Sequence, residues 1–446
     1  MKRLLVLLVL SFSAPAIILG WMKTYGGSNF DYSYGVQRTS NNGYIIAGYT
    51  ESFGPKGFNL WIIVTNSKGD TISTKIYGDA YIDMKYSLQS TLDGNFIISA
   101  EKWNDSNPLN TDLWVLKLKP NGDTLWTRSF DYGESEWGNW ISQTSDGGYI
   151  VAGNDDAFSS LIKLDANGDS VWPYDYFKIQ ELFLCVQETN DGNYIVCGFS
   201  AGWGTNTSQD LRLTKISSQG EVIWDKKYGL TDFDRGDCVR QTSDGGYILT
   251  GLSTTLGGLW LLKTNAQGDT SWTKVFKDGR GYCVQQTKDG GYIITGEVWT
   301  LIKTDPLGNV TWTKKYIDVG RYVEETPDGG FIVVGANNYY NHNMDICLIK
   351  TDANGDTLSA VSELPVTPFP DFELLSPIGP RIVLRFAEAK EPRVLSVFDA
   401  SGRKVDEVVA PQAGGVVNWG ECYGPGVYFM RVESKGNRPH KVVLIR

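Results

Sequence analysis

Aromatic side chains interleaved with carboxylates and amides are the residues of this chain best suited to hold a ligand. They lie in segments of variable length between short apolar runs. Aromatic faces stack on the C–H faces of sugar rings, and the neighbouring polar groups reach the hydroxyls. The candidate ligand-binding residues are Trp103, Trp137, Trp140, Trp203, Trp299, Tyr339 and Tyr340. A purely structural interpretation, in which these rings cover strand ends, stays open for each of them.

Catalysis is the second interpretation of the same segments. Their carboxylates could act as the general acid and base of a glycoside hydrolase or lyase, but the sequence does not single out any pair of carboxylates as catalytic. The two histidines, His342 and His440, lack metal-ligand spacing, and the chain has neither a serine elbow nor a phosphate-binding glycine loop. No catalytic residue is therefore predicted. The first hypothesis is a binding or adhesion module without catalysis, and the alternative is a secreted carbohydrate-active enzyme. A passive surface scaffold without a small ligand is a third interpretation.

Two acidic turns have oxygen ligands at alternate positions, as calcium loops do. They run from Asp165 to Asp169 and from Asp352 to Asp356. Each turn leads directly into a strand pattern, whereas a calcium loop supplies further carboxylates and a bidentate glutamate downstream. Hairpin turns are the favoured interpretation, and we predict no metal and no cofactor.

A sequence repeat must position all of these residues. Its copies begin at Thr39, Thr91, Thr144, Thr189, Thr242, Thr287 and Thr326. The spacing of 39 to 53 residues is typical of propellers and solenoids. Each copy predicts four short strands, two of them joined by an Asp-Gly turn such as Asp146-Gly147. The second strand, for example Tyr149 to Gly153, is apolar without alternation, which indicates that both of its faces are covered.

The chain begins with a fourth strand that has no repeat of its own. A tryptophan stands four residues after the second turn glycine in five copies, but Ser73 and Ser359 replace it in the first and last copies. Residues 21–26 carry the missing pattern, starting with Trp21. A strand that completes the last sheet would close the ring and protect its edges. We therefore predict an all-β chain with a seven-bladed β-propeller over residues 17–360.

The Gly-Asp-Thr-x-Trp turn, as in Gly122-Asp123-Thr124-Leu125-Trp126, resembles the blade repeat of pyrroloquinoline-quinone-type propellers. The resemblance covers the third and fourth strands only. It implies blade docking and therefore fold, and no quinone follows from it.

Propeller geometry assigns the loops of this chain to two faces. The first-to-second and third-to-fourth strand turns form one face, which we call the turn face, and they are short and nearly invariant. The other connections vary in length and content and form the variable face. Because binding residues are often located on loops held by a rigid scaffold, we expect the site on the variable face.

Both ends of the chain indicate export. Residues 1–16 have the charged, apolar and small-residue regions of a signal peptide, and their apolar run is shorter than the roughly 20 residues that span a bilayer. The net charge of -10 argues against nucleic acid or anionic lipid as a partner. We expect a secreted or cell-surface protein without a transmembrane segment in the mature chain, whose partner is a glycan or a surface protein.

The cysteines predict no disulfide framework. Cys185, Cys238 and Cys283 occupy equivalent places four residues before the repeat threonine, on the innermost strands of three successive blades. Neighbouring inner strands should stand farther apart than the roughly 7 Å that a disulfide allows. With Cys197 and Cys347, these thiols are interpreted as reduced, buried and apolar. A thiolate metal site is the less favoured alternative.

A different module follows the repeats. Residues 361–371 form a Pro-rich linker, and residues 372–446 contain strand patterns that predict a small β-sandwich. The segments 397–405, 424–432 and 441–444 resemble the type A C-terminal sorting domain of the type IX (Por) secretion system. This resemblance implies that residues 372–446 engage the secretion machinery and are removed or used for anchoring. The flagellar hook-cap protein has similar strands, so the resemblance alone leaves the export route open.

Overall fold

The computed structural model divides the chain into two compact units, residues 1–360 and 361–446. Each unit is described by itself. The structure describes residues 20–55, 57–78, 87–103, 110–133, 135–154, 159–172, 178–179, 181–200, 209–229, 232–277, 279–297, 301–337, 344–357, 373–376, 378–379, 381–386, 394–409, 412, 415–432 and 440–444.

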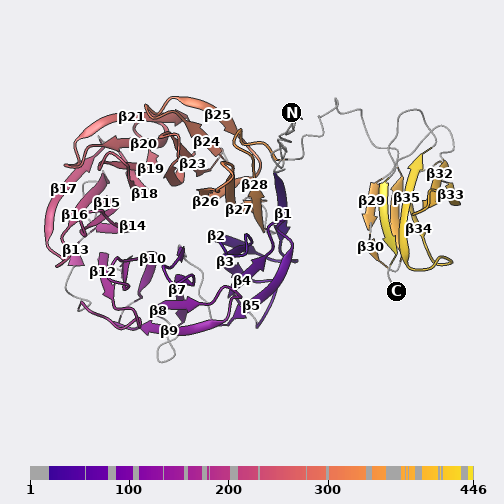
Figure 1. Cartoon of the computed structure of the whole chain (residues 1–446), viewed down its shortest axis with the longest axis horizontal. Helices are drawn as coiled ribbons and strands as arrows, with labels where there is room; N and C mark the ends of the chain where they lie inside the picture. Colours follow the sequence, from indigo (N-terminus) through magenta and orange to yellow (C-terminus); the bar gives the residue numbers. More distant parts are fainter. Residues whose placement is uncertain are drawn as a thin grey trace, which may run out of the picture. The chain divides into compact units, whose positions relative to one another are not determined.

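The first unit is a ring of antiparallel sheets (Figure 1). Its described residues form seven four-stranded sheets. Six of them follow the sequence from the inside of the ring outwards: β2 (Asp31–Arg38), β3 (Tyr44–Thr50), β4 (Asn59–Thr65), β5 (Thr71–Tyr77); β6 (Ser87–Ser90), β7 (Phe96–Trp103), β8 (Thr111–Leu118), β9 (Thr124–Phe130); β10 (Trp137–Gln143), β11 (Tyr149–Asn154), β12 (Ser159–Leu164), β13 (Lys178–Ile179); β14 (Glu181–Glu188), β15 (Tyr194–Ser200), β16 (Leu211–Ile216), β17 (Val222–Tyr228); β18 (Asp234–Gln241), β19 (Tyr247–Ser253), β20 (Gly258–Thr264), β21 (Thr270–Lys277); and β22 (Gly281–Gln286), β23 (Tyr292–Gly296), β24 (Leu301–Thr304), β25 (Val310–Lys314).

The seventh sheet joins the two ends of the ring. Its inner strands are β26 (Val319–Glu325), β27 (Phe331–Asn337) and β28 (Asp345–Lys350), and its outer strand is β1 (Trp21–Tyr25). Strand β1 runs antiparallel to β28, with Trp21 opposite Lys350 and Tyr25 opposite Ile346. Residues more than 300 positions apart in the sequence therefore lie side by side (Figure 1).

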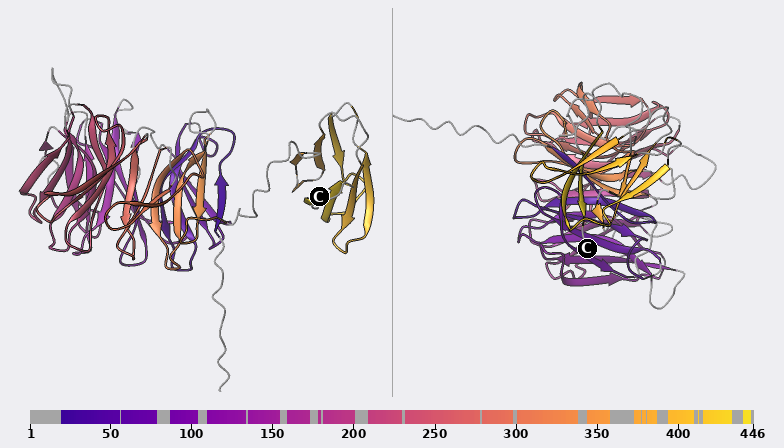
Figure 2. Two further views of the ribbon diagram at one scale, coloured as in Figure 1. Left: turned by 90° about the horizontal axis from the view of Figure 1, so that it is seen from above. Right: turned by 90° about the vertical axis from the view of Figure 1, so that its right-hand side faces the viewer.

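Burial along each sheet follows from its place in the ring. All seven residues of β3 and all seven of β4 are buried, because neighbouring sheets cover both of their faces. The outer strand β5 alternates between exposed and half-buried side chains. Figure 2 shows the strands of this unit crossing the ring from one face to the other, so that turns and loops collect on the two faces.

The third sheet departs from the expected pattern at its outer edge. The fourth strand was predicted around Trp172, but there the structure has only an isolated bridge between Leu164 and Ser170. The outer strand is the two-residue β13, which pairs with the start of β12. Residues 173–177, over which the predicted strand would continue, lie outside the described residues.

The innermost strands share one irregularity. In β2, β10, β14, β18, β22 and β26 the pairing register shifts by one residue, five positions before the repeat threonine. Such a bulge leaves one residue out of the ladder and re-aims its side chain. The unpaired residues are Tyr34, Asn139, Leu184, Asp237, Tyr282 and Arg321.

The second unit contains two sheets in its described residues. One has the order β29 (Glu373–Ser376), β31 (Ile382–Phe386), β34 (Gly415–Trp419), and the other β30 (Ile378–Gly379), β36 (His440–Leu444), β35 (Gly426–Val432), β32 (Val394–Asp399), β33 (Lys404–Val409). Leu384 of the first sheet and Val397 and Met430 of the second belong to one buried core. The sequence prediction missed β29, β30 and β33, because these strands are short or polar.

Candidate functional site

The repeated tryptophans dock each sheet onto the next one. Trp224 of β17 meets Tyr247 of the following sheet edge-on, with 6.0 Å between the ring centroids. The same contact, at 5.7 to 6.0 Å, joins the pairs Trp21–Tyr44, Trp126–Tyr149, Trp172–Tyr194, Trp272–Tyr292 and Trp312–Phe331. Edge-to-face pairs of this kind stabilise packed interfaces. These tryptophans are therefore structural, in agreement with the docking role that the blade resemblance implies.

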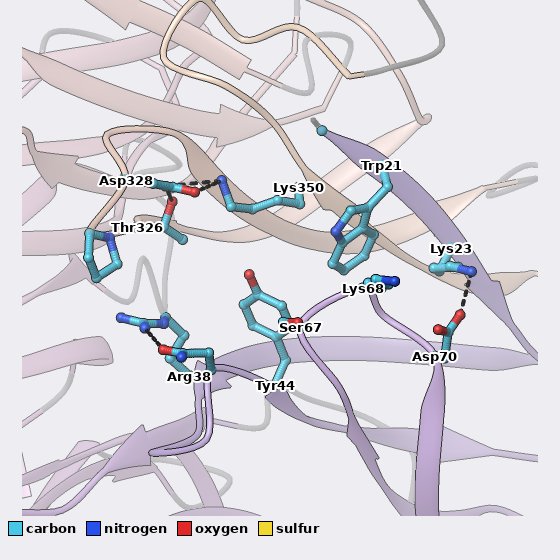
Figure 3. Close-up of a pocket in the computed structure, with 13 residues that line it drawn as sticks. Trp21, Lys23, Arg38, Tyr44, Ser67, Lys68, Asp70, Thr326, Asp328 and Lys350 are labelled. Carbon is cyan, nitrogen blue, oxygen red and sulfur yellow. Dashed lines mark hydrogen bonds and ion pairs between the residues drawn. The ribbon is translucent and has the colours of Figure 1, made fainter. Parts of the chain in front are cut away.

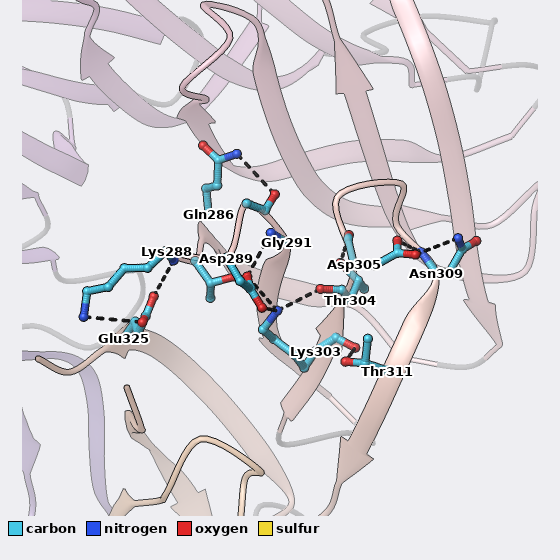
Figure 4. Close-up of polar contacts among 12 residues, drawn as sticks. Gln286, Lys288, Asp289, Gly291, Lys303, Thr304, Asp305, Asn309, Thr311 and Glu325 are labelled. Carbon is cyan, nitrogen blue, oxygen red and sulfur yellow. Dashed lines mark hydrogen bonds and ion pairs between the residues drawn. The ribbon is translucent and has the colours of Figure 1, made fainter. Parts of the chain in front are cut away.

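An ion pair between a buried lysine and a largely exposed turn aspartate recurs in the sheets, near the turn face. Lys303 at the end of β24 lies 2.8 Å from Asp289 of the first turn, and its ammonium also donates to the carbonyl of Thr304 (Figure 4). The Thr287 hydroxyl donates to the same carboxylate. Equivalent pairs, at 2.5 to 2.9 Å, are Lys117–Asp93, Lys163–Asp146, Lys215–Asp191, Lys263–Asp244 and Lys350–Asp328. In the first sheet both partners are replaced together, by Val64 and Asn41.

In the acidic turns at residues 165–169 and 352–356, the first aspartate accepts hydrogen bonds from the backbone of its own turn. Asp165 Oδ1 accepts hydrogen bonds from the backbone N–H groups of Asn167 and Asp169, at 2.8 and 2.9 Å. Asp352 does the same with Asn354 and Asp356. This is the side-chain chemistry of a tight turn, and it supports the hairpin interpretation.

The bulged residues of the inner strands converge on the ring axis. Tyr34, Asn139, Leu184, Asp237, Tyr282 and Arg321, together with Trp140, line one cavity of about 30 Å³. A space of this size holds about one water molecule. The inner strands begin at the variable face. We therefore call this cavity, together with Arg235 and Arg280, which stand two residues before the bulged positions of their strands, the axial mouth of that face.

Cations outnumber anions at the axial mouth. Arg280 Nε lies 2.7 Å from Asp237 Oδ2, and Arg235 Nη2 lies 3.1 Å from Asp237 Oδ1. One buried carboxylate thus serves two guanidinium groups. Burial lowers the pKa of Arg235; the carboxylate of Asp237 opposes this shift, whereas the charge of Arg280 adds to it. Arginine keeps its proton in proteins, so Arg235 stays charged in spite of its burial.

Arg321 lies in an aromatic cage beside this pair. Its guanidinium carbon is 3.8 Å from the ring centroid of Tyr282, and 5.1 and 5.3 Å from those of Tyr32 and Tyr34. Its Nε donates to the hydroxyl of Tyr32. Cation–π contacts hold the guanidinium plane but leave its edge for hydrogen bonding. In the described residues no carboxylate pairs with Arg321 within 4 Å.

The structure places only some of the predicted ligand-binding residues. Trp140 lines the axial cavity and stacks on Arg240, whose guanidinium carbon is 4.5 Å from the ring centroid. Trp137 is half-buried at the start of β10, and Trp103 is exposed at the end of β7. Trp203, Trp299, Tyr339 and Tyr340 lie outside the described residues.

Sequence reasoning missed the arginines of the axial mouth. Arg321 stands five residues before a repeat threonine, and Arg235 and Arg280 stand seven before theirs. The repeat offers a signal, because the positions five and seven before the threonine vary from copy to copy, whereas the position three before it is always valine, isoleucine or leucine. The bulge that aims the fifth residue at the axis has no signature in the sequence.

The cysteines on the inner strands are free and buried, as are Cys197 and Cys347. Burial is the largest cause that raises the pKa of Cys185, to about 11, and that of Cys238, to about 12. Arg240 donates to Cys185 Sγ over 3.3 Å. These thiols act as neutral packing groups around a buried cation.

One acidic group has carboxylate oxygens close enough to share a cation. Asp112, Asp131 and Glu136 each offer an oxygen within 4.8 Å of the others. Glu136 also accepts a hydrogen bond from the backbone of Tyr132, and Asp112 accepts one from Ser129. Acidic clusters without a bound ion are common, so this group by itself defines no metal site.

A hollow of about 750 Å³ lies on the turn face where β1 closes the ring (Figure 3). It is lined by residues 20, 21 and 23 of the N-terminal strand, by turn residues of the first sheet and by Pro327 and Asp328 of the last one. In Figure 3 Trp21, Tyr44, Arg38 and Lys350 surround the open centre. We call this space the closure hollow.

Comparison with known proteins places the fold of the chain. No protein-family model and no curated protein matches the sequence. Among solved structures, a puromycin hydrolase aligns with a TM-score of 0.53 and 11% identity, over 81% of this chain and 59% of that one. The first unit is a β-propeller. At this identity the likeness shows the fold alone.

Two bacterial proteins align less closely. PorZ, a surface component of the type IX secretion system of Porphyromonas gingivalis, has a TM-score of 0.47 and 10% identity over 95% of this chain. BamB from Moraxella catarrhalis has a TM-score of 0.42 and 9% identity, over 74% of this chain and all of that one. The present chain spans 60% of the PorZ chain. Within the described part of the propeller and its companion unit, no helix could cross a bilayer.

Proposed function

We propose that this protein is an exported, cell-surface or secreted propeller that binds a ligand at the axial mouth of its variable face without chemical conversion. The propeller has seven blades in this proposal, since seven four-stranded sheets form in the described residues and β1 completes the last one. A glycan is the proposed ligand, because planar donors and aromatic rings together suit hydroxyl-rich rings.

The cage around Arg321 carries the proposal. Its guanidinium is held by Tyr282 and Tyr32, and it borders a cavity with the amide of Asn139 and the indole of Trp140. A donor fixed in this way loses little entropy on binding. The alternative of a carbohydrate-active enzyme differs in one measurable outcome, the release of reducing ends from the polysaccharide.

The test uses the full chain on a panel of polysaccharides. We expect retention of at least one polysaccharide without release of reducing ends. Arg321→Met and Arg321→Lys should both weaken retention, because neither offers the planar fork. Arg128→Met, which removes an outer arginine paired with Asp169, is the matched control and should bind normally. Release of reducing ends would favour the enzyme, and undiminished binding by both Arg321 variants would overturn the axial site.

Residues 372–446, which follow the Pro-rich linker at residues 361–371, are proposed to form a β-sandwich that directs export, and residues 1–16 a signal peptide. The two sheets around a common core support the sandwich. In a bacterium with a type IX secretion system, the chain without residues 361–446 should stay in the periplasm. Surface display of this shortened chain would contradict the sorting role.

A further inference from the structure

The turns of neighbouring blades are tied together by a hydrogen bond that repeats around the ring. The side chain just before the repeat threonine accepts from the backbone N–H of the residue that follows the repeat threonine in the preceding blade. Glu325, for example, accepts from the N–H of Lys288 over 2.8 Å (Figure 4). Four more seams have the same bond: Leu92–Gln143, Ser145–Glu188, Asn190–Gln241 and Ser243–Gln286, at 2.6 to 2.8 Å.

The seam between the last and the first blade, which we call the closure seam, cannot form this bond, because both the donor and the acceptor residue are replaced there. Pro327 stands where the donor should be, and proline has no backbone N–H. Arg38 stands where the acceptor should be, and a guanidinium accepts no hydrogen bond. Arg38 instead donates to Asn42 Oδ1 in its own turn, at 2.5 Å. The closure hollow opens at this seam and is lined by both residues.

Positive charge predominates in the closure hollow. Four of its lining residues are cationic, namely Lys23, Arg38, Lys68 and Lys350, and two are anionic, Asp70 and Asp328. Lys23 pairs with Asp70 at 2.7 Å and Lys350 with Asp328 at 2.9 Å, which leaves Arg38 and Lys68. Within the described structure Lys68 makes no ion pair. The buried Glu324 of β26 feels the charge of Arg38 but does not line the hollow.

The walls of the closure hollow also offer ring surface and a neutral donor. Trp21 contributes its half-buried indole, packed edge-on against Tyr44 at 5.8 Å. Burial and, to a smaller extent, the charge of Asp328 raise the pKa of Tyr44 to about 12, so its hydroxyl stays protonated at neutral pH. A volume of about 750 Å³ is within the range of small-molecule sites.

We propose that the closure hollow binds a small ring-bearing oxyanion, with Arg38 and Lys68 on the carboxylate or phosphate and Trp21 against the ring. This site is separate from the axial mouth and lies on the opposite face of the propeller. Guanidinium groups bind both oxyanions through paired hydrogen bonds, and an ammonium adds charge. The residues that prevent the seam hydrogen bond also build the site. Pro327 and Arg38 leave the seam open, and Arg38 supplies one of the two cations.

Titration calorimetry of the full chain tests the proposal with D-glucuronate, glucose 6-phosphate and neutral D-glucose. We expect at least one of the two anions to bind and glucose not to bind, and comparison of the two anions identifies the preferred oxyanion. Arg38→Gln and Lys68→Gln should each weaken binding about tenfold, as expected for the loss of a charged hydrogen bond. Lys119→Gln removes an exposed lysine from a neighbouring turn and should leave binding unchanged.

A second variant separates loss of the site from loss of the fold. Arg38→Gln combined with Pro327→Ser introduces the residue types of the Ser243–Gln286 seam and allows the missing bond to form. We expect this double variant to lose binding while its unfolding midpoint stays equal or rises. Binding of glucose as strong as that of the anions, no binding of either anion, or full binding by the double variant would each overturn the proposal. Retention of polysaccharides through Arg321 is measured separately and does not depend on the outcome.

Discussion

Trp21 and Tyr44 meet edge-on across the point where the ring closes, with 5.8 Å between ring centroids. Gly69, at a positive φ of 76°, lies under the same indole, where a Cβ would come within 2.5 Å of the Trp21 ring. The N-terminal strand therefore uses the same docking contact as the internal seams.

Replacement of Trp21 should weaken the closure as much as replacement of an internal docking tryptophan weakens its seam. We expect Trp21→Ala and Trp312→Ala each to lower the free energy of unfolding by about 2–4 kcal/mol, since both rings are partly buried. Ile72→Ala, at an exposed position, is the control. Deletion of residues 21–26 should lower the unfolding midpoint and promote association. An unchanged monomeric midpoint would show that closure does not depend on β1.

The ion pair of the buried Lys303 and the exposed Asp289 should behave as a unit. Asp289→Asn leaves the 6%-exposed Lys303 without its carboxylate and should cost roughly 1–3 kcal/mol in unfolding free energy. The double variant Asp289→Asn with Lys303→Val reproduces Asn41 and Val64 of the first sheet and should cost less than the two single changes added together. Denaturant unfolding of all three variants measures the coupling. Strict additivity would contradict it.

Stability should fall in acid as the turn carboxylates take up protons. Burial raises the pKa of Asp146 and of Asp244, but hydrogen bonds from their lysine and threonine partners outweigh it and lower both values from 3.8 to about 2. A lowered folded-state pKa gives stability that is complete above about pH 4 and disappears as the pH falls towards 2. Thermal unfolding from pH 6 to pH 2 should show this fall. It should be smaller in the variant with Asp146→Asn and Lys163→Val.

Thiol reactivity should distinguish the two units. Cys422 is exposed, whereas Cys185, Cys197, Cys238, Cys283 and Cys347 are buried. An aromatic disulfide reagent should therefore modify one thiol in the native protein and six after denaturation. Cys422→Ser should abolish the native reaction. Rapid native modification of a second thiol would show that the inner strands open.

The sequence by itself determined the repeating unit. The repeat threonine, the Asp-Gly turn and the apolar second strand predict local structure, because turn chemistry and strand periodicity act over a few residues. The orphan strand at Trp21 was also visible as a missing part of the last copy. The fourth strand predicted near Trp172 lies only partly within the described residues, which contain a bridge at Ser170 and the two-residue strand β13.

Only the tertiary structure decided where side chains gather. The bulges that turn Arg321 and Tyr282 towards the axis depend on pairing between strands, and this pairing has no local signature. The closure hollow is lined by both Arg38 and Pro327, which lie 289 positions apart in the sequence. Each residue alone is an ordinary variation of the repeat. The two residues line one space because ring closure brings the first and last blades together, which is a long-range consequence of packing.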